Sequence, residues 1–429
     1  MWKIKTRPTI ARIAAIALLA PLFTVMDVPG GVGPVAYALQ DSDCTPDVTV
    51  ADGTLGNGTD GQPDQVGNVS SYVSAYAVDS DDDGTNDECV LEFIQPDVVM
   101  EWDNPNFGEN GVDYLVVAGG GGASFGGGGG GGFAEGLRSN STAVSGSLLG
   151  PTTRVYVGEG GVGADDPSVD QGGDGGDSYL ISSNSDGSFE QASTIDDDED
   201  GEVRVVMGQA AVVIMKGGGG GARVADQIEE GRPGGSSGGS YGTPGGNGIP
   251  SGTPPLNSDF GFGGGITSND FSKVKVAGGG GGASEAGGTT TALISGNNGH
   301  ISLGDGGEGK PSSITGTERI YGSGGGGSAD IGDQGATTGR GTSTFDGGGL
   351  TSSLAGRETD QNGLMNRGGG GGGNLFDSGE FGSDYFDKVD FTQYPGGNGG
   401  SGVVIVRFAP PPVDPVPVLG DVTRTVGGF

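Results

Sequence analysis

Runs of consecutive glycine follow short apolar runs along this chain, and this alternation constrains the fold more than any other feature. Glycine supplies 99 of the 429 residues and loses more backbone entropy on folding than any other residue, so ordered polyglycine needs an unusual source of stability. Apolar runs lead directly into glycine at 114–122, 211–221 and 274–282. Flexible linkers do not usually alternate with such runs, so we expect the apolar runs to share one β core.

We also expect the glycine runs to be ordered. Polyglycine can form an extended left-handed helix with about three residues per turn and no internal hydrogen bonds, so its amides must bond to neighbours or water. Only glycine lets such helices approach closely enough to bond one another. We therefore predict an all-β fold, with a β-sandwich or jelly-roll-like core, packed polyglycine II helices and long glycine-rich loops. The alternative is that the runs are disordered loops, in which case Gly129→Val would not lower stability.

The N-terminal segment 1–38 has the features of a signal peptide. An apolar run at 13–26 is short for a membrane span, and Ala36-Tyr37-Ala38 offers an A-x-A cleavage site. The basic residues before the apolar run are Lys3, Lys5, Arg7 and Arg12. An uncleaved anchor is the alternative. No later stretch approaches ~18 continuous apolar residues, so we expect no membrane span after the signal peptide and an extracellular or cell-surface location.

Three regions follow the signal peptide. Residues 39–88 form an acidic, turn-rich segment, and residues 89–408 carry the repeated apolar and glycine runs. Residues 409–429 begin with a proline-rich linker and continue into what reads as the opening strand of a further, truncated β domain. The glycine-rich β domain is thus expected to occupy most of the exported chain.

The chain has two cysteines, Cys44 and Cys89. Because export exposes the chain to oxidising conditions, we predict a disulfide between them, which would close a segment that has little apolar content. Two free thiols are the alternative. Two cysteines and a single histidine are too few for a zinc site of the usual kind.

Four sequence stretches resemble a known family. They are VDYLVVAGGGGASFGGGGGGG at 112–132, VYVGEGGVG at 155–163, GGDGGDSYL at 172–180 and PGGNGGSGVVIVRF at 395–408. Together they resemble the glycine-rich domain of bacterial surface and secreted proteins, and are similar to such domains in phage tail-tip adhesins and anaplastic-lymphoma-kinase-type receptors. The resemblance covers 89–408. It implies a β-sandwich decorated by packed polyglycine helices, and it implies no catalytic residues.

An acidic loop suggests a cation site. Asp79, Asp81, Asp83 and Asp87 follow the pattern D-x-D-x-D-G-x-x-D, which supplies alternate carboxylates and a glycine turn as Ca²⁺ prefers. The twelfth position holds Val90 instead of a bidentate Glu, so the loop is closer to extracellular calcium-binding repeats than to an EF-hand. Simple solvation of acidic residues is the alternative. A weaker copy lies at 196–201.

Charge and motif spacing disfavour several functions. Asp and Glu number 55 against 20 Lys and Arg, and the net charge of −35 repels nucleic acid. The stretch 304–310 matches a phosphate-binding loop, but Pro311 stands where Ser or Thr should bind Mg²⁺, so no nucleotide is expected. His300 is the single histidine and lacks the context of a nucleophile elbow, so we predict that the chain is not an enzyme.

These features favour a non-catalytic extracellular module with a structural or adhesive function in a bacterial surface or secreted protein. Its expected partner is an extracellular glycan or protein. A secreted hydrolase acting on polysaccharide and a phage-type receptor-binding protein are the alternatives. The glycine content and the single histidine argue against the first, and the signal peptide argues against the second.

Overall fold

A computed structural model gives the structure of part of the chain. It describes residues 39–44, 48–51, 72–79, 84–104, 111–138, 144–145, 151–167, 169–183, 203–205, 211–223, 229–242, 261–265, 267–268, 275–295, 298–330, 337–339, 348, 361–373 and 395–409. The predicted signal peptide, the acidic copy at 196–201 and the linker after 409 lie outside these residues. Asp81 and Asp83 of the predicted calcium loop lie outside them as well.

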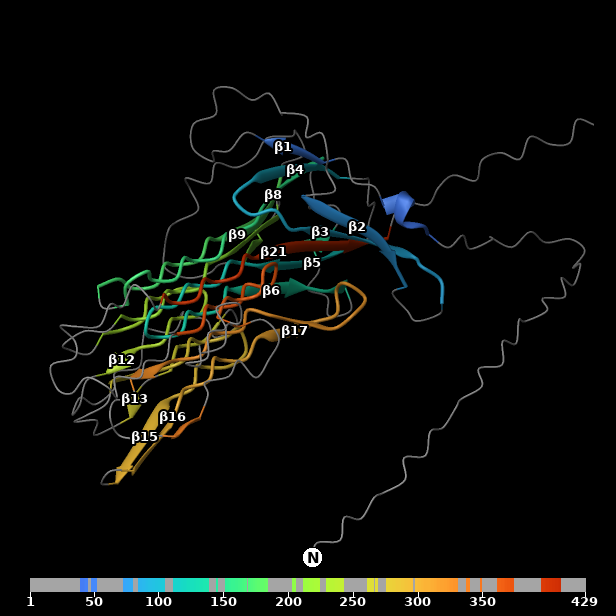
Figure 1. Ribbon diagram of the computed structural model, residues 1–429. Coiled ribbons are helices and arrows are strands. Elements are labelled where there is room, and N and C mark those ends of the chain that lie inside the picture. The colour runs from blue at the N-terminus through green and yellow to red at the C-terminus, as the bar shows by residue number, and fades with distance from the viewer. Residues whose placement is uncertain are drawn as a thin grey trace, which may run out of the picture. The chain divides into compact units, whose positions relative to one another are not determined.

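Two antiparallel sheets form the main β structure, and the all-β prediction is confirmed (Figure 1). The first sheet has the order β1 (Val48–Ala51), β4 (Val99–Asp103), β8 (Thr152–Tyr156), β9 (Ser178–Ser182), β11 (Ala211–Met215) and β10 (Val203–Val205). The second has the order β2 (Val73–Val78), β3 (Glu88–Phe93), β21 (Val403–Phe408), β5 (Gly111–Val117) and β6 (Phe133–Gly136), with β7 (Val144–Ser145) also paired to β5. The single 3-10 turn η1 (Asp41–Cys44) is the only helical element among the described residues.

The two sheets pack face to face as a β-sandwich. Trp102 of the first sheet lies between two aromatic rings of the second, 6.3 Å from Phe93 and 5.6 Å from Phe408, measured between ring centroids. Alternate residues of β3, β5 and β21 point into this space, as the twofold period of a strand requires, and all three aromatic residues are buried. Aromatic residues contribute large areas to a core, so this trio marks its centre.

The outer face of the second sheet is also covered. A hairpin of β17 (Lys310–Ser312) and β18 (Arg319–Tyr321) brings Ile314 and Tyr321 into a second apolar cluster with Leu115 and Ile405 of the sheet. Both faces of β5 and β21 are therefore buried. This explains why these strands read as near-continuous apolar runs and not as alternating ones.

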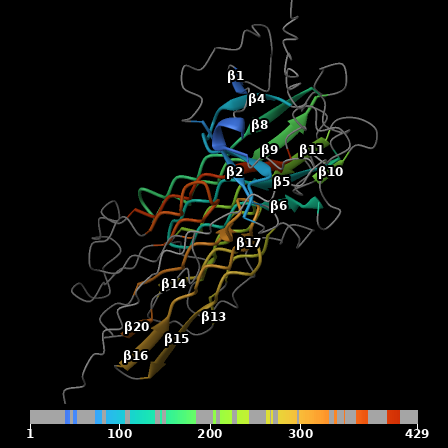
Figure 2. The same cartoon turned by 90° about the vertical axis from the view of Figure 1, so that its right-hand side faces the viewer.

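Smaller sheets lie outside the sandwich (Figure 2). One joins β12 (Tyr241–Gly242), β14 (Lys275–Ala277) and β19 (Ala329–Asp330), and another joins β13 (Thr267–Ser268), β15 (Thr290–Ser295), β16 (Asn298–Ser302) and β20 (Thr337–Gly339). The described part of the apolar run, 275–277, therefore belongs to a separate sheet, and the expectation of one shared β core for all the runs is wrong for it. Its register partners are Tyr241, Gly242, Ala329 and Asp330, none of which is in the sandwich.

Glycine segments continue from the strands of the sandwich as wavy, side-by-side chains (Figure 1). Strands β5, β8 and β11 run into such segments, and other segments lead back into β6, β9 and β21. We call the hydrogen-bonded array that they form the glycine lattice, and its segments are 118–124, 126–132, 158–164, 171–177, 216–222, 231–240, 261–265, 277–283, 285–288, 303–309, 322–328, 361–363, 368–373 and 395–402.

Backbone hydrogen bonds within the lattice follow a period of three. In segment 118–124 successive N–H groups donate in rotation to segments 126–132, 171–177 and 395–402, at N···O distances between 2.8 and 3.1 Å. Its carbonyls accept in rotation from 158–164, 216–222 and 368–373. A threefold rotation of bonds, all made to neighbours and none made internally, is the pattern of packed polyglycine II helices. The prediction that the runs are ordered agrees with this structure.

Segment 126–132 is enclosed in the same way. It donates to 216–222, 277–283 and 368–373 and accepts from 118–124, 231–240 and 322–328. A Cβ placed on Gly129 would lie 2.9 Å from the carbonyl carbon of Ser237 and nearer still to the carbonyl of Ser236. Because those atoms belong to a hydrogen-bonded backbone, they cannot rotate away as a side chain could. Glycine is therefore required there by space.

Candidate functional site

Side chains complete the lattice where a neighbouring segment is missing. Within the described residues, two N–H groups of segment 216–222 bond no glycine segment, and two aspartate side chains accept from them instead. Asp174 Oδ1 accepts from the N–H of Gly220 at 2.9 Å, and Asp177 Oδ1 accepts from the N–H of Gly217 at 2.8 Å. The two aspartates are three residues apart, so the threefold period of the segment places both on the same side.

The second oxygen of each aspartate bonds a cation. Asp174 Oδ2 accepts from Arg232 Nη1 at 3.1 Å, and Asp177 Oδ2 lies 3.1 Å from Lys216 Nζ. Each carboxylate therefore joins a backbone amide to a charged side chain. Asn398 acts similarly on another side of the lattice, because its Oδ1 accepts from the N–H of Gly163 at 2.7 Å.

An open groove of about 510 Å³ adjoins this edge. The residues that line it come from segments far apart in sequence: Val162, Gly163, Ala164, Asp165, Val169, Asp170, Gln171, Gly173, Arg223, Glu229 and Arg232. The lattice holds the backbones of those that lie in its segments, such as Gly173 and Arg232. Gly173 donates its N–H to the carbonyl of Val162 at 2.8 Å, and Arg232 donates its N–H to the carbonyl of Gly220 at 2.8 Å.

Polar side chains along the groove form a continuous ladder of hydrogen bonds. Arg223 Nε donates to Glu229 Oε1 at 3.1 Å, and Gln171 Nε2 donates to the same oxygen at 3.2 Å. Arg232 Nε then donates to Gln171 Oε1 at 3.0 Å and Arg232 Nη1 to Asp174. Each member is held by two or more partners, so the planar groups of the ladder are fixed in orientation before any ligand arrives.

Apolar side chains lie beside this ladder. Val162 is 67% exposed and Val169 is 55% exposed, and both line the groove. Among the described residues, the other large apolar side chains with high exposure are Leu364 and Met365, which do not line it. Arg223 Nη1 donates to the carbonyl of Val169 at 2.7 Å, so the ladder also holds one of the two valines in place.

The groove therefore combines fixed donors, fixed acceptors and an apolar surface in an open cavity. The groove is mostly polar, and its convergent polar groups could set the orientation of a polar ligand while the valines add apolar contact. These residues were not predicted from the sequence. The period-three spacing of GGDGGD at 172–177 was the available signal, because it predicts that the two aspartates share a side of the segment.

The predicted calcium loop connects β2 to β3. Gly84 has a φ of +87°, a left-handed conformation that favours glycine, and its N–H donates to Asp79 Oδ2 at 2.6 Å. Asp87 donates its N–H to the carbonyl of Val78 at 3.0 Å, which closes the loop. No group of three His, Cys, Asp or Glu side chains that could hold a metal occurs in the described residues, which do not include Asp81 and Asp83.

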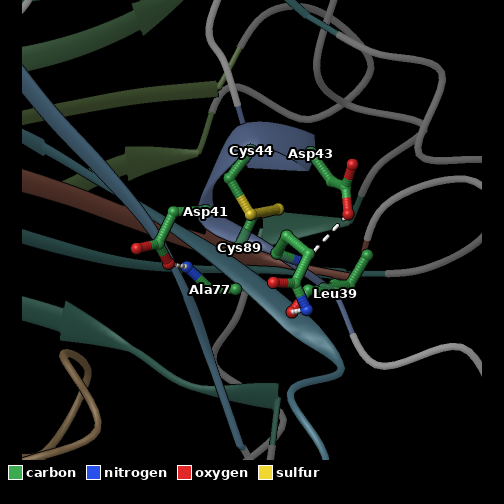
Figure 3. The surroundings of a disulfide bond; sticks show 7 residues. Leu39, Asp41, Asp43, Cys44, Ala77 and Cys89 are labelled. Atoms are coloured by element: carbon green, nitrogen blue, oxygen red, sulfur yellow. Dashed lines mark hydrogen bonds between the residues drawn. A yellow bond between two sulfur atoms is a disulfide. The ribbon is translucent and has the colours of Figure 1, made fainter.

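The predicted disulfide between Cys44 and Cys89 is confirmed (Figure 3). It attaches η1 to β3 of the sandwich. Asp41 of η1 accepts the N–H of Ala77 at 3.0 Å through Oδ1, so a hydrogen bond to β2 supports the same attachment. The bond joins the described part of the acidic N-terminal segment to the glycine-rich domain.

A buried charge cluster lies at one end of the second sheet. Asp113 is 1% exposed and bonds Arg138 Nε through Oδ1 at 3.1 Å and Arg407 Nη2 through Oδ2 at 2.8 Å. Glu88 pairs with both arginines. Burial by itself would raise the pKa of Asp113, but hydrogen bonds from Arg138 and Arg407 outweigh it and hold the pKa below its ordinary value. The charges satisfy one another, and we assign this cluster to stability.

The stretch that imitates a phosphate-binding loop belongs to the glycine lattice. Gly307 donates its N–H to the carbonyl of Gly280 at 2.8 Å, and Gly304 donates to Thr290 Oγ1 at 2.7 Å. Lys310 lies in β17, where its Nζ is 5.1 Å from the ring centroid of Phe133. These amides are engaged in packing, which accounts for the glycine spacing without a phosphate.

Comparison with known proteins agrees with this architecture. The model of a family described as a glycine-rich domain matches residues 100–409, which is more than half of the 429-residue chain. No curated protein matches the chain in sequence. Within the part of the chain that the structure describes, no helix has the length and apolar character that a membrane crossing requires. The chain, with its ordered glycine segments, belongs to the glycine-rich domain family.

Proposed function

We propose that the chain is a non-catalytic extracellular module of a bacterial surface or secreted protein, with an adhesive function exerted through the groove beside Asp174. The observation that carries this proposal is the groove, whose ladder of polar side chains is held by its own hydrogen bonds. Ordering side chains and loops on binding costs about 0.5–1.5 kcal/mol for each immobilised side chain, and a site that is already ordered avoids much of this cost.

The architecture as a whole supports the proposal. The lattice segments beside the groove are hydrogen-bonded to one another through their backbones. A mechanical load on a bound ligand would therefore have to break these bonds before the groove changes shape. The Cys44–Cys89 disulfide supports exposure to an oxidising compartment, since such bonds persist mainly outside the cytosol. The expected partner is an extracellular glycan or protein.

A flow experiment tests adhesion. Beads coated with the purified exported chain are passed over two surfaces, one coated with mucin and the other with a protein that carries no glycans. The beads retained on each surface are counted. We expect retention on mucin that is lost when the chain is unfolded before coupling. Equal retention of folded and unfolded chains on both surfaces would contradict an adhesive function.

The loop from Asp79 to Asp87 is the proposed calcium site. Support comes from the left-handed Gly84 and from its N–H bond to Asp79, which bend the loop as a cation site with alternate carboxylates requires. Calorimetry of the full chain with CaCl₂ should give heat that is removed in Asp81→Asn and kept in Asp43→Asn, a change in a nearby aspartate outside the loop. No heat at millimolar Ca²⁺, or equal heat in both variants, would count against calcium binding.

A further inference from the structure

We propose that the groove lined by Arg223, Glu229, Gln171, Arg232 and Val162 binds a neutral glycan through a pyranose residue. This inference rests on the proposed adhesive function and specifies its ligand. It follows from three properties of the groove, which are its balance of charge, its mixture of donors and acceptors, and its apolar side.

The balance of charge disfavours an ionic ligand. Two arginines line the groove with three acids, Asp165, Asp170 and Glu229. Arg223 is already bonded to Glu229 and Arg232 to Asp174. An added anion would meet three carboxylates and a chain of net charge −35, and an added cation would meet two guanidinium groups. A neutral ligand avoids both kinds of repulsion.

Hydroxyl groups match the ladder because each of them both donates and accepts. The Nη2 atoms of Arg223 and Arg232 have no partner among the described residues and remain able to donate. Glu229 uses Oε1 for its bonds within the ladder, so Oε2 remains able to accept. Two adjacent hydroxyls of a sugar can each bond one atom of a planar guanidinium or carboxylate group, which favours paired bonds.

The apolar side of the groove matches the other surface of a sugar ring. A pyranose carries C–H groups on its faces and hydroxyls on its edge, so it can contact valine methyl groups and a polar ladder at once. Val162 and Val169 expose such methyl groups. The volume of about 510 Å³ is within the common range for small-ligand sites, and the open side lets the remainder of a longer glycan extend into solvent.

A printed glycan array tests the proposal with the purified full chain. The probes are neutral oligosaccharides of hexoses and N-acetylhexosamines, and their sialylated and sulfated counterparts. We expect binding to a subset of the neutral glycans. We also expect Val162→Asp and Arg223→Ala each to weaken that binding about tenfold or more, since each removes a direct contact or adds a desolvated charge.

Met365→Asp is the matched control, because Met365 is 70% exposed and lies outside the lining of the groove. It adds the same charge as Val162→Asp and should bind as the unmodified chain does. Circular dichroism verifies that all variants are folded. Binding restricted to sialylated or sulfated glycans, or binding unchanged in folded Val162→Asp, would overturn the proposal.

The flow experiment separates failure of this inference from failure of the proposed function. If beads adhere to mucin and Val162→Asp adheres equally, adhesion stands and the groove is not its site. If beads do not adhere and no glycan is bound, the proposed function fails together with the inference.

Discussion

The sandwich and the glycine lattice of this protein are stabilised by opposite parts of the chain. Among the described strands of the sandwich the backbone pairs within each sheet, and side chains such as Trp102, Phe93 and Phe408 join the sheets. In the lattice the side chains are absent over most positions, and the backbone amides and carbonyls join every segment to its neighbours. The same chain thus uses the hydrophobic effect in one region and a hydrogen-bond network in the other.

The comparison shows how sensitivity to mutation differs between the two regions. Replacing a buried side chain of the sandwich with a smaller one lowers the stability of the protein, because it leaves a cavity. Replacing a glycine of the lattice with a larger residue lowers the stability of the protein, because the added side chain would collide with backbone atoms of neighbouring segments. Substitutions in each region test this contrast.

Trp102→Ala should lower the free energy of unfolding by about 3–5 kcal/mol, because the side chain is 1% exposed and lies between two aromatic rings. Trp102→Phe is the control and should cost much less, because a large aromatic ring still occupies the site. Denaturant unfolding followed by circular dichroism measures both. A loss below about 1 kcal/mol in the alanine variant would show that the sandwich does not depend on this residue.

Asp113 should make stability depend on pH. Its pKa is lowered in the folded protein, so the unfolded chain binds the proton more tightly, and the stabilisation is present above the unfolded pKa of about 3.9. It is lost as pH falls through the folded pKa. Hydrogen bonds to charged groups contribute about 1.5–3 kcal/mol, and this sets the expected scale.

Denaturant unfolding between pH 6 and pH 3 measures that effect. Asp113→Asn cannot titrate, so its stability should fall less steeply below pH 4 than that of the unmodified chain. Identical pH profiles for the two proteins would mean that the charge cluster contributes nothing to the pH dependence.

Gly129→Ala should lower stability by about 1–3 kcal/mol, because the added Cβ meets the backbone of Ser236 and Ser237. Gly173→Ala is the matched control at the edge of the lattice, where the nearest atom to an added Cβ is the Val162 nitrogen at 3.1 Å. The control should cost clearly less. Thermal midpoints measure both, and an unchanged or raised midpoint in Gly129→Ala would contradict the packed lattice.

The smallest effect is expected at the edge. Replacing Asp174 and Asp177 with Ala leaves the N–H groups of Gly220 and Gly217 without their acceptors, and should cost about 1–2 kcal/mol. Replacing both with Asn keeps an acceptor oxygen and removes only exposed ion pairs, which contribute about 0–1 kcal/mol. Chemical unfolding should therefore give a lower free energy of unfolding for the double Ala variant than for the double Asn variant. Equal losses of stability in the two double variants would assign the effect to the lost charges and not to the hydrogen bonds from the backbone N–H groups.

The sequence predicted the local elements of the fold much better than it predicted the site. Apolar runs such as 403–406 identify strands, and glycine runs identify lattice segments, because both signals depend only on neighbouring residues. The groove joins residues near 162 and 171 to residues near 223 and 232. No local pattern relates those positions, so Arg223 and Arg232 could not be assigned to a site in advance.

By itself the sequence determined the β character of the chain, its family and the pairing of Cys44 with Cys89. It also indicated that the glycine segments are ordered and not disordered loops. Tertiary structure decided which glycine segments became neighbours, that residues 275–277 joined a separate sheet, and that Asp174 and Asp177 accept the N–H groups of Gly220 and Gly217. The physical reason is that glycine segments have no side chains to distinguish one from another. Their neighbours are chosen by where the flanking strands place them and by which amides would otherwise lack a partner.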